Sequence, residues 1–150
     1  MSEPLHILVL ADTHNHLPPK LEELAAGADE IWHLGDVCAP RLLQTIREVG
    51  APVTIVRGNC DGEDEWPLTV DLERNGTRFR LIHIPPARTP ENVAVLLHGH
   101  THVPRDEVRN GVRFLNPGCV TRPNRGAPAS VAHLTISASG EIGWELKQLR

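Results

Sequence analysis

Short apolar runs followed by Asp, Asn or His are the feature that most constrains this chain. The five runs are 5–11, 31–34, 53–56, 79–82 and 93–97. Runs of this length are typical of strands that are covered on both faces of a sheet. The polar residues that follow them are Asp12, His14, Asp36, Asn59, His83, His100 and His102. Because ligands bind beyond the carboxyl ends of strands in open α/β sheets, we expect these side chains to meet at one edge.

The first third of the chain alternates between strand and helix patterns. A helix is predicted over 18–26, with Pro18 and Pro19 in its first turn and Gly27 as its C-terminal cap. A second helix is predicted between Pro40 and Gly50, where apolar residues recur at helical spacing. Strand, helix, strand, helix, strand in this order predicts a parallel sheet with right-handed crossovers.

The later part of the chain carries three hairpin signals. Asn75-Gly76 joins 68–73 to 78–84, Asn110-Gly111 joins 105–108 to 112–115, and Ser139-Gly140 joins 131–136 to 142–146. Such pairs favour tight turns between antiparallel strands, so this part is predicted to be mostly antiparallel. With no repeat or linker visible, we expect one domain over residues 1–150, with either one mixed sheet or two facing sheets.

Composition limits the classes of function. The chain is 40% hydrophobic and 23% charged, with a formal net charge of −4, which disfavours a broad nucleic-acid surface. It remains compatible with a phosphorylated substrate, because bound metal ions supply local positive charge. No run approaches the roughly 18 apolar residues of a membrane helix, and the N-terminal stretch lacks the basic region of a signal peptide. We therefore expect a cytoplasmic protein without a membrane partner.

The three cysteines, Cys38, Cys60 and Cys119, show no compact spacing. An odd number of cysteines without such spacing does not predict a disulfide framework. A reducing compartment, with all three as thiols, is the simpler interpretation.

The polar residues at the strand ends have the chemistry of a metal centre. Mixed oxygen and imidazole ligands suit Mn, Fe, Zn, Ni or Co better than Ca. Two ions roughly 3.5–4 Å apart form a clamp for displacement at phosphorus. Two such ions, two carboxylates and a hydroxide would leave a net charge of about +1, which attracts phosphate.

The ordered motifs resemble the signature of the calcineurin-like metallophosphoesterases. They are Asp12-Thr13-His14, Gly35-Asp36, Gly58-Asn59-Cys60-Asp61, His83 and Gly99-His100-Thr101-His102. Asn116-Pro117-Gly118-Cys119 is similar to the segment that follows in the small bacterial phosphodiesterase branch. The resemblance implies a four-layer α/β/β/α sandwich with mixed sheets. It also implies hydrolysis of a small phosphoester, more probable for a diester than a monoester, by a hydroxide that bridges two divalent ions.

The resemblance also implies which residues hold these ions, Mn being expected first. One ion is assigned to Asp12, His14, Asp36 and His102, and the other to Asp36, Asn59, His83 and His100. Asn59 and His100 would further stabilise the transition state. Cys60 stands where larger members carry a His that protonates the leaving group, so it is either a weak acid or a passive wall. Asp61 either acts in the chemistry or holds its loop through backbone hydrogen bonds.

The sequence departs from the family pattern at two further places, both after His83. Ile84 replaces a usual Gly, which predicts a different course for the loop after His83, and segment 84–92 is shorter than in relatives. His33 and His98 are candidates for orienting ligands, and Cys119 for a structural turn.

The alternative function is a scaffold or binding module like the retromer subunit of the same fold, with weak or no catalysis. A homo-oligomer is left open, and the sequence names no specific substrate.

Overall fold

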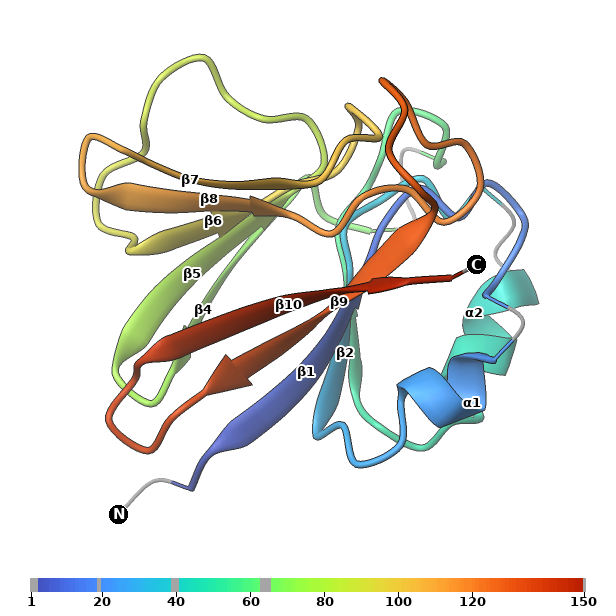
Figure 1. Cartoon of the computed structure of the whole chain (residues 1–150), viewed down its shortest axis with the longest axis horizontal. Coiled ribbons are helices and arrows are strands. Elements are labelled where there is room, and N and C mark those ends of the chain that lie inside the picture. The colour runs from blue at the N-terminus through green and yellow to red at the C-terminus, as the bar shows by residue number, and fades with distance from the viewer. Residues whose placement is uncertain (1–2, 19, 39–40, 63–65, 150) are drawn as a thin grey trace.

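Two five-stranded sheets face each other in the computed structural model, which describes residues 3–18, 20–38, 41–62 and 66–149 (Figure 1). The first sheet has the order β10 (Ile142–Gln148), β9 (Ser130–Ile136), β1 (Leu5–Leu10), β2 (Glu30–His33) and β3 (Val53–Ile55). The second has the order β4 (Thr69–Arg74), β5 (Thr77–Ile82), β6 (Val95–Leu97), β8 (Val112–Asn116) and β7 (Arg105–Arg109). The predicted mixed α/β sandwich is therefore confirmed.

The alternating pattern of the first third gives the parallel part of the first sheet. Strands β1, β2 and β3 are parallel, and α1 (Leu21–Leu24) and α2 (Arg41–Arg47) lie in the connections between them. Both helices pack on the side of this sheet that faces away from the second sheet (Figure 1). Both are shorter than predicted, and Pro19 and Pro40 lie outside the described residues.

The three predicted hairpins form, but the second sheet is less antiparallel than expected. β4 pairs with β5, β7 with β8, and β9 with β10, each antiparallel. However, β6 lies between β5 and β8 and is parallel to both. A turn signal fixes only the two strands that it joins, so it could not reveal these contacts between distant segments. The consequence is functional, because β5, β6 and β8 end at the same edge of the sheet.

The main core lies between the two sheets. Trp32 of β2 meets Phe79 of β5 edge to face, with ring centroids 5.4 Å apart, and both side chains are fully buried. On the outer face of the second sheet, the Arg105 guanidinium lies 4.4 Å from the centroid of the Phe114 ring. The described residues of segment 84–92 form no helix. This face of the sheet is therefore covered by the aliphatic parts of arginine side chains and by a loop.

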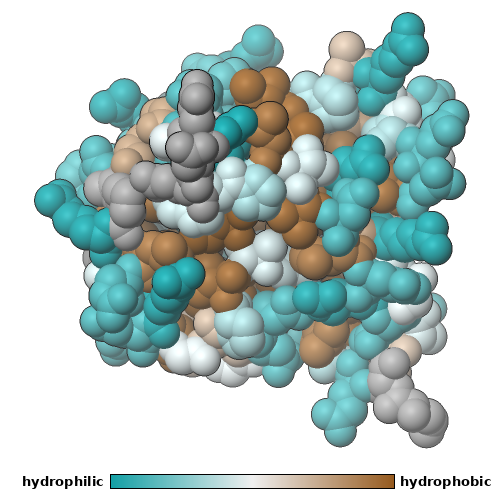
Figure 2. All heavy atoms as spheres, turned by 180° about the vertical axis from the view of Figure 1, so that it is seen from behind, coloured by the Kyte–Doolittle hydropathy of each residue, from teal (hydrophilic) through white to brown (hydrophobic). Residues whose placement is uncertain are grey.

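The face seen in Figure 2 is hydrophilic around its edge and has apolar areas across its middle. Four large apolar side chains are clearly exposed among the described residues: Leu68, Ile84, Val108 and Leu146. Within the described ranges, neither helix has the length and hydropathy needed to cross a bilayer.

Replacing Phe79 by Ala should lower the free energy of unfolding by about 3–5 kcal/mol, because it removes a buried ring and leaves a cavity between the sheets. Urea denaturation of the metal-free protein measures this change. Val108→Ala is the control, since Val108 is 68% exposed and should change stability by less than about 0.5 kcal/mol. A Phe79→Ala cost close to the control would contradict the central place of this contact.

Candidate metal centre

Six parallel strands, three from each sheet, bring their carboxyl ends to one edge of the sandwich. β1, β2 and β3 lead to Asp12, Asp36 and Asn59, whereas β5 and β6 lead to His83 and His100. The sixth strand, β8, ends at Asn116, which supports the loop of His100. The fold thus delivers polar side chains from distant parts of the chain to one place.

All seven sequence-predicted ligand residues lie in one connected cluster. Asp12 Oδ1 lies 3.8 Å from His14 Nε2, 3.7 Å from His83 Nε2 and 3.5 Å from His102 Nε2. Asp36 Oδ2 lies 3.7 Å from His14 Nε2 and 3.3 Å from His83 Nε2.

Asn59 links the remaining histidine to this cluster. Its Oδ1 lies 3.0 Å from His83 Nε2 and 3.1 Å from His100 Nδ1. Both carboxylates, Asp12 Oδ1 and Asp36 Oδ2, lie within 3.8 Å of His14 Nε2 and of His83 Nε2, so they connect the two groups of imidazoles.

Backbone contacts decide which nitrogen of these histidines faces the centre. His83 Nδ1 donates to Leu34 O at 2.7 Å, and His102 Nδ1 donates to Arg122 O at 2.7 Å. An imidazole that uses its Nδ1 proton in this way presents a bare Nε2, which is the ligand form of histidine. The Nε2 atoms therefore face carboxylate and amide oxygens that are also acceptors, and only a proton or a metal ion between them resolves this contact.

Two buried atoms at the centre have no hydrogen-bond partner within the described part of the chain. They are Asp12 Oδ1 and His14 Nε2. Buried polar atoms are nearly always satisfied, so such a pair requires a ligand. The chemistry of the donor set, with carboxylate, amide and imidazole groups, fits a divalent transition metal. The residues present thus fit the group that the sequence motifs imply.

The backbone at this edge is strained in a way that the sequence did not reveal. Five ligand residues, Asp12, His14, Asp36, His100 and His102, have φ between 46° and 72°. Residues other than glycine rarely adopt this left-handed region, and each instance costs of the order of 1 kcal/mol or more. The surrounding contacts must therefore hold these residues in place.

Asp61 is one of those contacts and settles a question that the sequence left open. Its two carboxylate oxygens accept the N–H groups of Asp36, Cys38 and Gly58 at 2.7–2.9 Å. Both oxygens are thus occupied by backbone donors. Asp61 therefore ties the loop of Asp36 to the loop of Asn59, and the catalytic role considered for it is not supported by its position.

His33 supports the loop that carries Asp12 and His14. Gly35 N–H donates to His33 Nδ1 at 3.1 Å, so His33 Nε2 carries the proton and donates to Thr13 Oγ1 at 3.1 Å. Thr13 Oγ1 in turn lies 3.4 Å from Asp36 O. This buried chain links the Asp12–His14 loop to the Asp36 loop without using either carboxylate.

The end of β8 and the segment that follows it hold the loops of Asp12 and His100. Asn116 Nδ2 donates to Thr101 Oγ1 at 3.1 Å and approaches Gly99 O at 3.3 Å. Cys119 Sγ and Thr121 Oγ1 both donate to Asp12 O, at 3.4 and 3.1 Å. His98, whose Nδ1 donates to Gly99 O at 2.9 Å, stiffens the same turn. Cys119 therefore has the structural role predicted for it.

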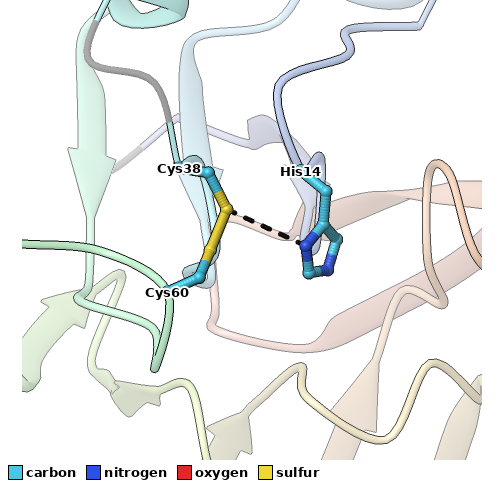
Figure 3. A group of neighbouring side chains, drawn as sticks. All are labelled: His14, Cys38 and Cys60. Atoms are coloured by element: carbon cyan, nitrogen blue, oxygen red, sulfur yellow. Dashed lines mark hydrogen bonds between the residues drawn. A yellow bond between two sulfur atoms is a disulfide. The ribbon is translucent and has the colours of Figure 1, made fainter.

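Cys60 corrects two predictions. It forms a disulfide with Cys38, with Cα atoms 5.5 Å apart, so these cysteines are not free thiols and Cys60 has no proton to give to a leaving group. Figure 3 shows the bridge beside the imidazole of His14, whose Nδ1 lies 3.8 Å from Cys38 Sγ. Because a disulfide sulfur only accepts, this weak contact also leaves His14 Nε2 bare.

The two carboxylates of the centre have different acidities in the metal-free chain. Burial raises the pKa of Asp12 to about 6, against the lowering effect of His83 and His102. Burial acts on Asp36 in the same direction. A hydrogen bond from His83, when that imidazole carries a proton on Nε2, and one from the Cys60 N–H outweigh burial and lower the pKa of Asp36 to about 2. Asp36 is therefore an anion at any physiological pH.

Comparison with known proteins agrees with this geometry. Residues 5–139 match the calcineurin-like phosphoesterase superfamily domain. This chain belongs to that superfamily. It is 31% identical over 160 residues to Phosphodiesterase YfcE of Escherichia coli, covering 87% of each chain. The structure of the E. coli phosphoesterase YfcE aligns with a TM-score of 0.76 at 27% identity, over 97% of this chain and 100% of the other.

A further solved structure has the same fold. Vacuolar Protein Sorting 29 from Cryptosporidium parvum aligns with a TM-score of 0.75 at 21% identity, covering 98% of this chain and 100% of the other. At this identity the likeness concerns the fold alone. The superfamily implies a hydrolase of phosphoric esters that uses divalent metal ions, which agrees with the donor set found here.

Removing the disulfide should destabilise the protein without abolishing the fold. In the variant with both Cys38→Ser and Cys60→Ser, we expect the free energy of unfolding to fall by roughly 3 kcal/mol, because the bridge closes a loop between residues 22 apart in sequence. Urea denaturation measures this loss. A thiol reductant should destabilise the wild type by a similar amount and leave the variant unchanged. A wild type insensitive to reductant would contradict the bridge.

His33 should make stability depend on pH in a defined direction. Burial lowers its pKa to about 3, whereas the unfolded chain takes up this proton near pH 6.5. Because the unfolded state binds more protons between these values, His33 favours unfolding increasingly as the pH falls from about 6.5 towards 3. In His33→Gln this contribution is absent.

The measurement is urea denaturation of metal-free wild type and His33→Gln at pH 7, 6 and 5. At pH 7 the variant should be less stable by about 1–3 kcal/mol, since it loses buried hydrogen bonds. The difference should then shrink by up to about 1.4 kcal/mol for each pH unit below 6. His16→Gln, at an exposed position, serves as the control. A difference that stays constant with pH would contradict the buried neutral state of His33.

Proposed function

We propose that this protein is a metal-dependent phosphodiesterase that hydrolyses a small phosphoester at a centre of two divalent transition-metal ions, with Mn expected first. The observation that carries the proposal is the unpartnered pair Asp12 Oδ1 and His14 Nε2, at the middle of a cluster of facing acceptors. When bound, the two ions would supply a nucleophile at neutral pH and neutralise charge on the phosphoryl group.

The ligand assignment follows the two ends of the cluster. Asp12, His14 and His102 would hold one ion, His83, Asn59 and His100 would hold the other, and Asp36 would serve both. Two divalent ions and two carboxylates sum to a charge of about +2, which attracts a phosphoester anion. The preference for a diester is supported by the YfcE relative, which is named a phosphodiesterase.

The residues of the chain contribute mainly by position. Asp61, His33 and Asn116 fix the ligand loops through backbone and hydroxyl contacts. A centre that is held rigid before substrate arrives needs little reorganisation during the reaction. His100 is exposed, and its Nδ1 lies 3.1 Å from Asn59 Oδ1, so this proposed ligand borders the solvent from which substrate arrives. With Cys60 in a disulfide and His100 assigned to a metal ion, leaving-group protonation falls to water.

The proposal is tested with bis-p-nitrophenyl phosphate and added Mn. The wild type should bind about two ions per chain and hydrolyse the diester faster than p-nitrophenyl phosphate. Asp36→Asn and His83→Ala should each lower kcat/KM by at least about 100-fold, because each loses a proposed metal ligand. His133→Ala is the matched control, since His133 lies on β9 and contacts His6 instead of the centre. Activity that persists without metal, or in either ligand variant, would refute the mechanism.

A scaffold function is the second candidate, and two observations favour it. Leu68 and Ile84 are 57% and 49% exposed, and the fold matches that of Vacuolar Protein Sorting 29. On this alternative the chain would bind metal and turn over no phosphoester. Two results together would therefore favour the scaffold over the enzyme. Elemental analysis would detect bound metal, and the rates of diester and monoester hydrolysis would not exceed the uncatalysed rates.

A further inference from the structure

Two of the four exposed large apolar side chains lie together, beside the metal centre. Leu68 and Ile84 line one pocket of about 360 Å³. The other two, Val108 and Leu146, lie on the outer strands β7 and β10. Exposed apolar residues scattered singly need no explanation, but a concave group of them marks a ligand site.

The pocket shares its wall with the proposed metal centre. Asn59 and His83 line it together with Leu68, Ile82 and Ile84. His83 Nε2 and Asn59 Oδ1, 3.0 Å apart, belong to the ligand cluster. A phosphoryl group bound at the centre would therefore lie next to the pocket, and one of its ester groups would reach the apolar wall.

The sheet register explains why these side chains meet. Thr69 of β4 pairs with Ile82 of β5, so Leu68 lies across from His83, within reach of Ile84. Ile82 is the last residue of β5 and Ile84 lies in the bend that follows it, and both line the pocket. Pro85 follows Ile84 and biases its backbone to an extended conformation, which keeps this side chain in place.

Two polar residues that line the pocket, Asp61 and Arg57, already have partners. The two oxygens of Asp61 accept backbone N–H groups of neighbouring loops. Arg57 N donates to Pro67 O at 2.8 Å, which holds the residue before Leu68 against the loop of Asn59. The wall that remains for a ligand is therefore largely apolar and held by backbone contacts.

We propose that this pocket binds an aromatic or compact apolar ester group of the phosphoester, and that Ile84 and Leu68 determine this specificity. The inference rests on the proposed function, since it places the phosphoryl group on the metal centre. A volume of about 360 Å³ is at the lower end for small-molecule sites, so it suits one ring and not a protein segment. The replacement of the usual Gly by Ile84 then has a purpose, since it supplies the side chain that contacts this ring.

Direct binding tests the inference without requiring turnover. The metal-loaded protein is titrated calorimetrically with phenylphosphonate and with methylphosphonate, whose carbon–phosphorus bonds are not hydrolysed. We expect the wild type to bind the phenyl compound at least about 10-fold more tightly, because apolar contacts in a pocket are worth factors of this size. Ile84→Ser and Leu68→Ser should each reduce this ratio about 3- to 5-fold.

Leu146→Ser is the matched control, because Leu146 is a similarly exposed apolar residue, at 41%, on β10. Its ratio should equal that of the wild type. A wild-type ratio near one, no binding of either phosphonate, or unchanged ratios in both pocket variants would overturn the inference. If the protein hydrolyses diesters but binds phenylphosphonate and methylphosphonate equally tightly, the role of the pocket is refuted and the proposed enzyme activity is not. Selective binding of phenylphosphonate without hydrolysis of any ester would refute the enzyme and leave the pocket standing.

Discussion

The crowding of lone pairs at one sheet edge is the constraint on which the rest of this structure depends. Asp12, Asp36 and Asn59 present oxygens to bare imidazole nitrogens 3.0–3.8 Å away. Such an arrangement is unfavourable without a cation, so it persists only where the backbone enforces it. The left-handed ligand residues, the carboxylate of Asp61 and the buried His33 all contribute to this enforcement. The unfavourable free energy of this arrangement is offset by the core between the sheets, where large apolar side chains such as Trp32 and Phe79 are fully buried.

Much of the fold was predictable, because its signals are local. Alternating strand and helix patterns gave the parallel part of the first sheet, and Asn-Gly or Ser-Gly pairs gave the three hairpins. The parallel placement of β6 between β5 and β8 was not predictable, since no local pattern specifies which distant strands will pair. Helix α1 is shorter than its apolar pattern suggested: it ends at Leu24, although Ala25 beyond it is buried in the same apolar cluster.

The candidate site shows the same division between local and distant information. All seven proposed ligand residues could be named from the sequence, because each follows an apolar run, and the structure brings their side chains together. The disulfide was missed, since spacing alone does not reveal that Cys38 and Cys60 follow neighbouring strands. Its signal was nevertheless present, because Cys38 follows Asp36 by two residues and Cys60 follows Asn59 by one. The supporting role of Asp61 could be anticipated only as one of two alternatives, because both use a carboxylate near the same loop.

The left-handed conformation of the ligand residues has a consequence for how this fold can change over time. Gly adopts such a backbone more easily than His or Asp, so replacing a proposed ligand by Gly would relieve strain while it removes a metal contact. Loss of chemistry and gain of stability would then go together at the same positions. A lineage that no longer needs the reaction could drift away from metal binding without crossing a barrier in folding. The same architecture could in this way be retained as a binding surface long after its original chemistry had been lost.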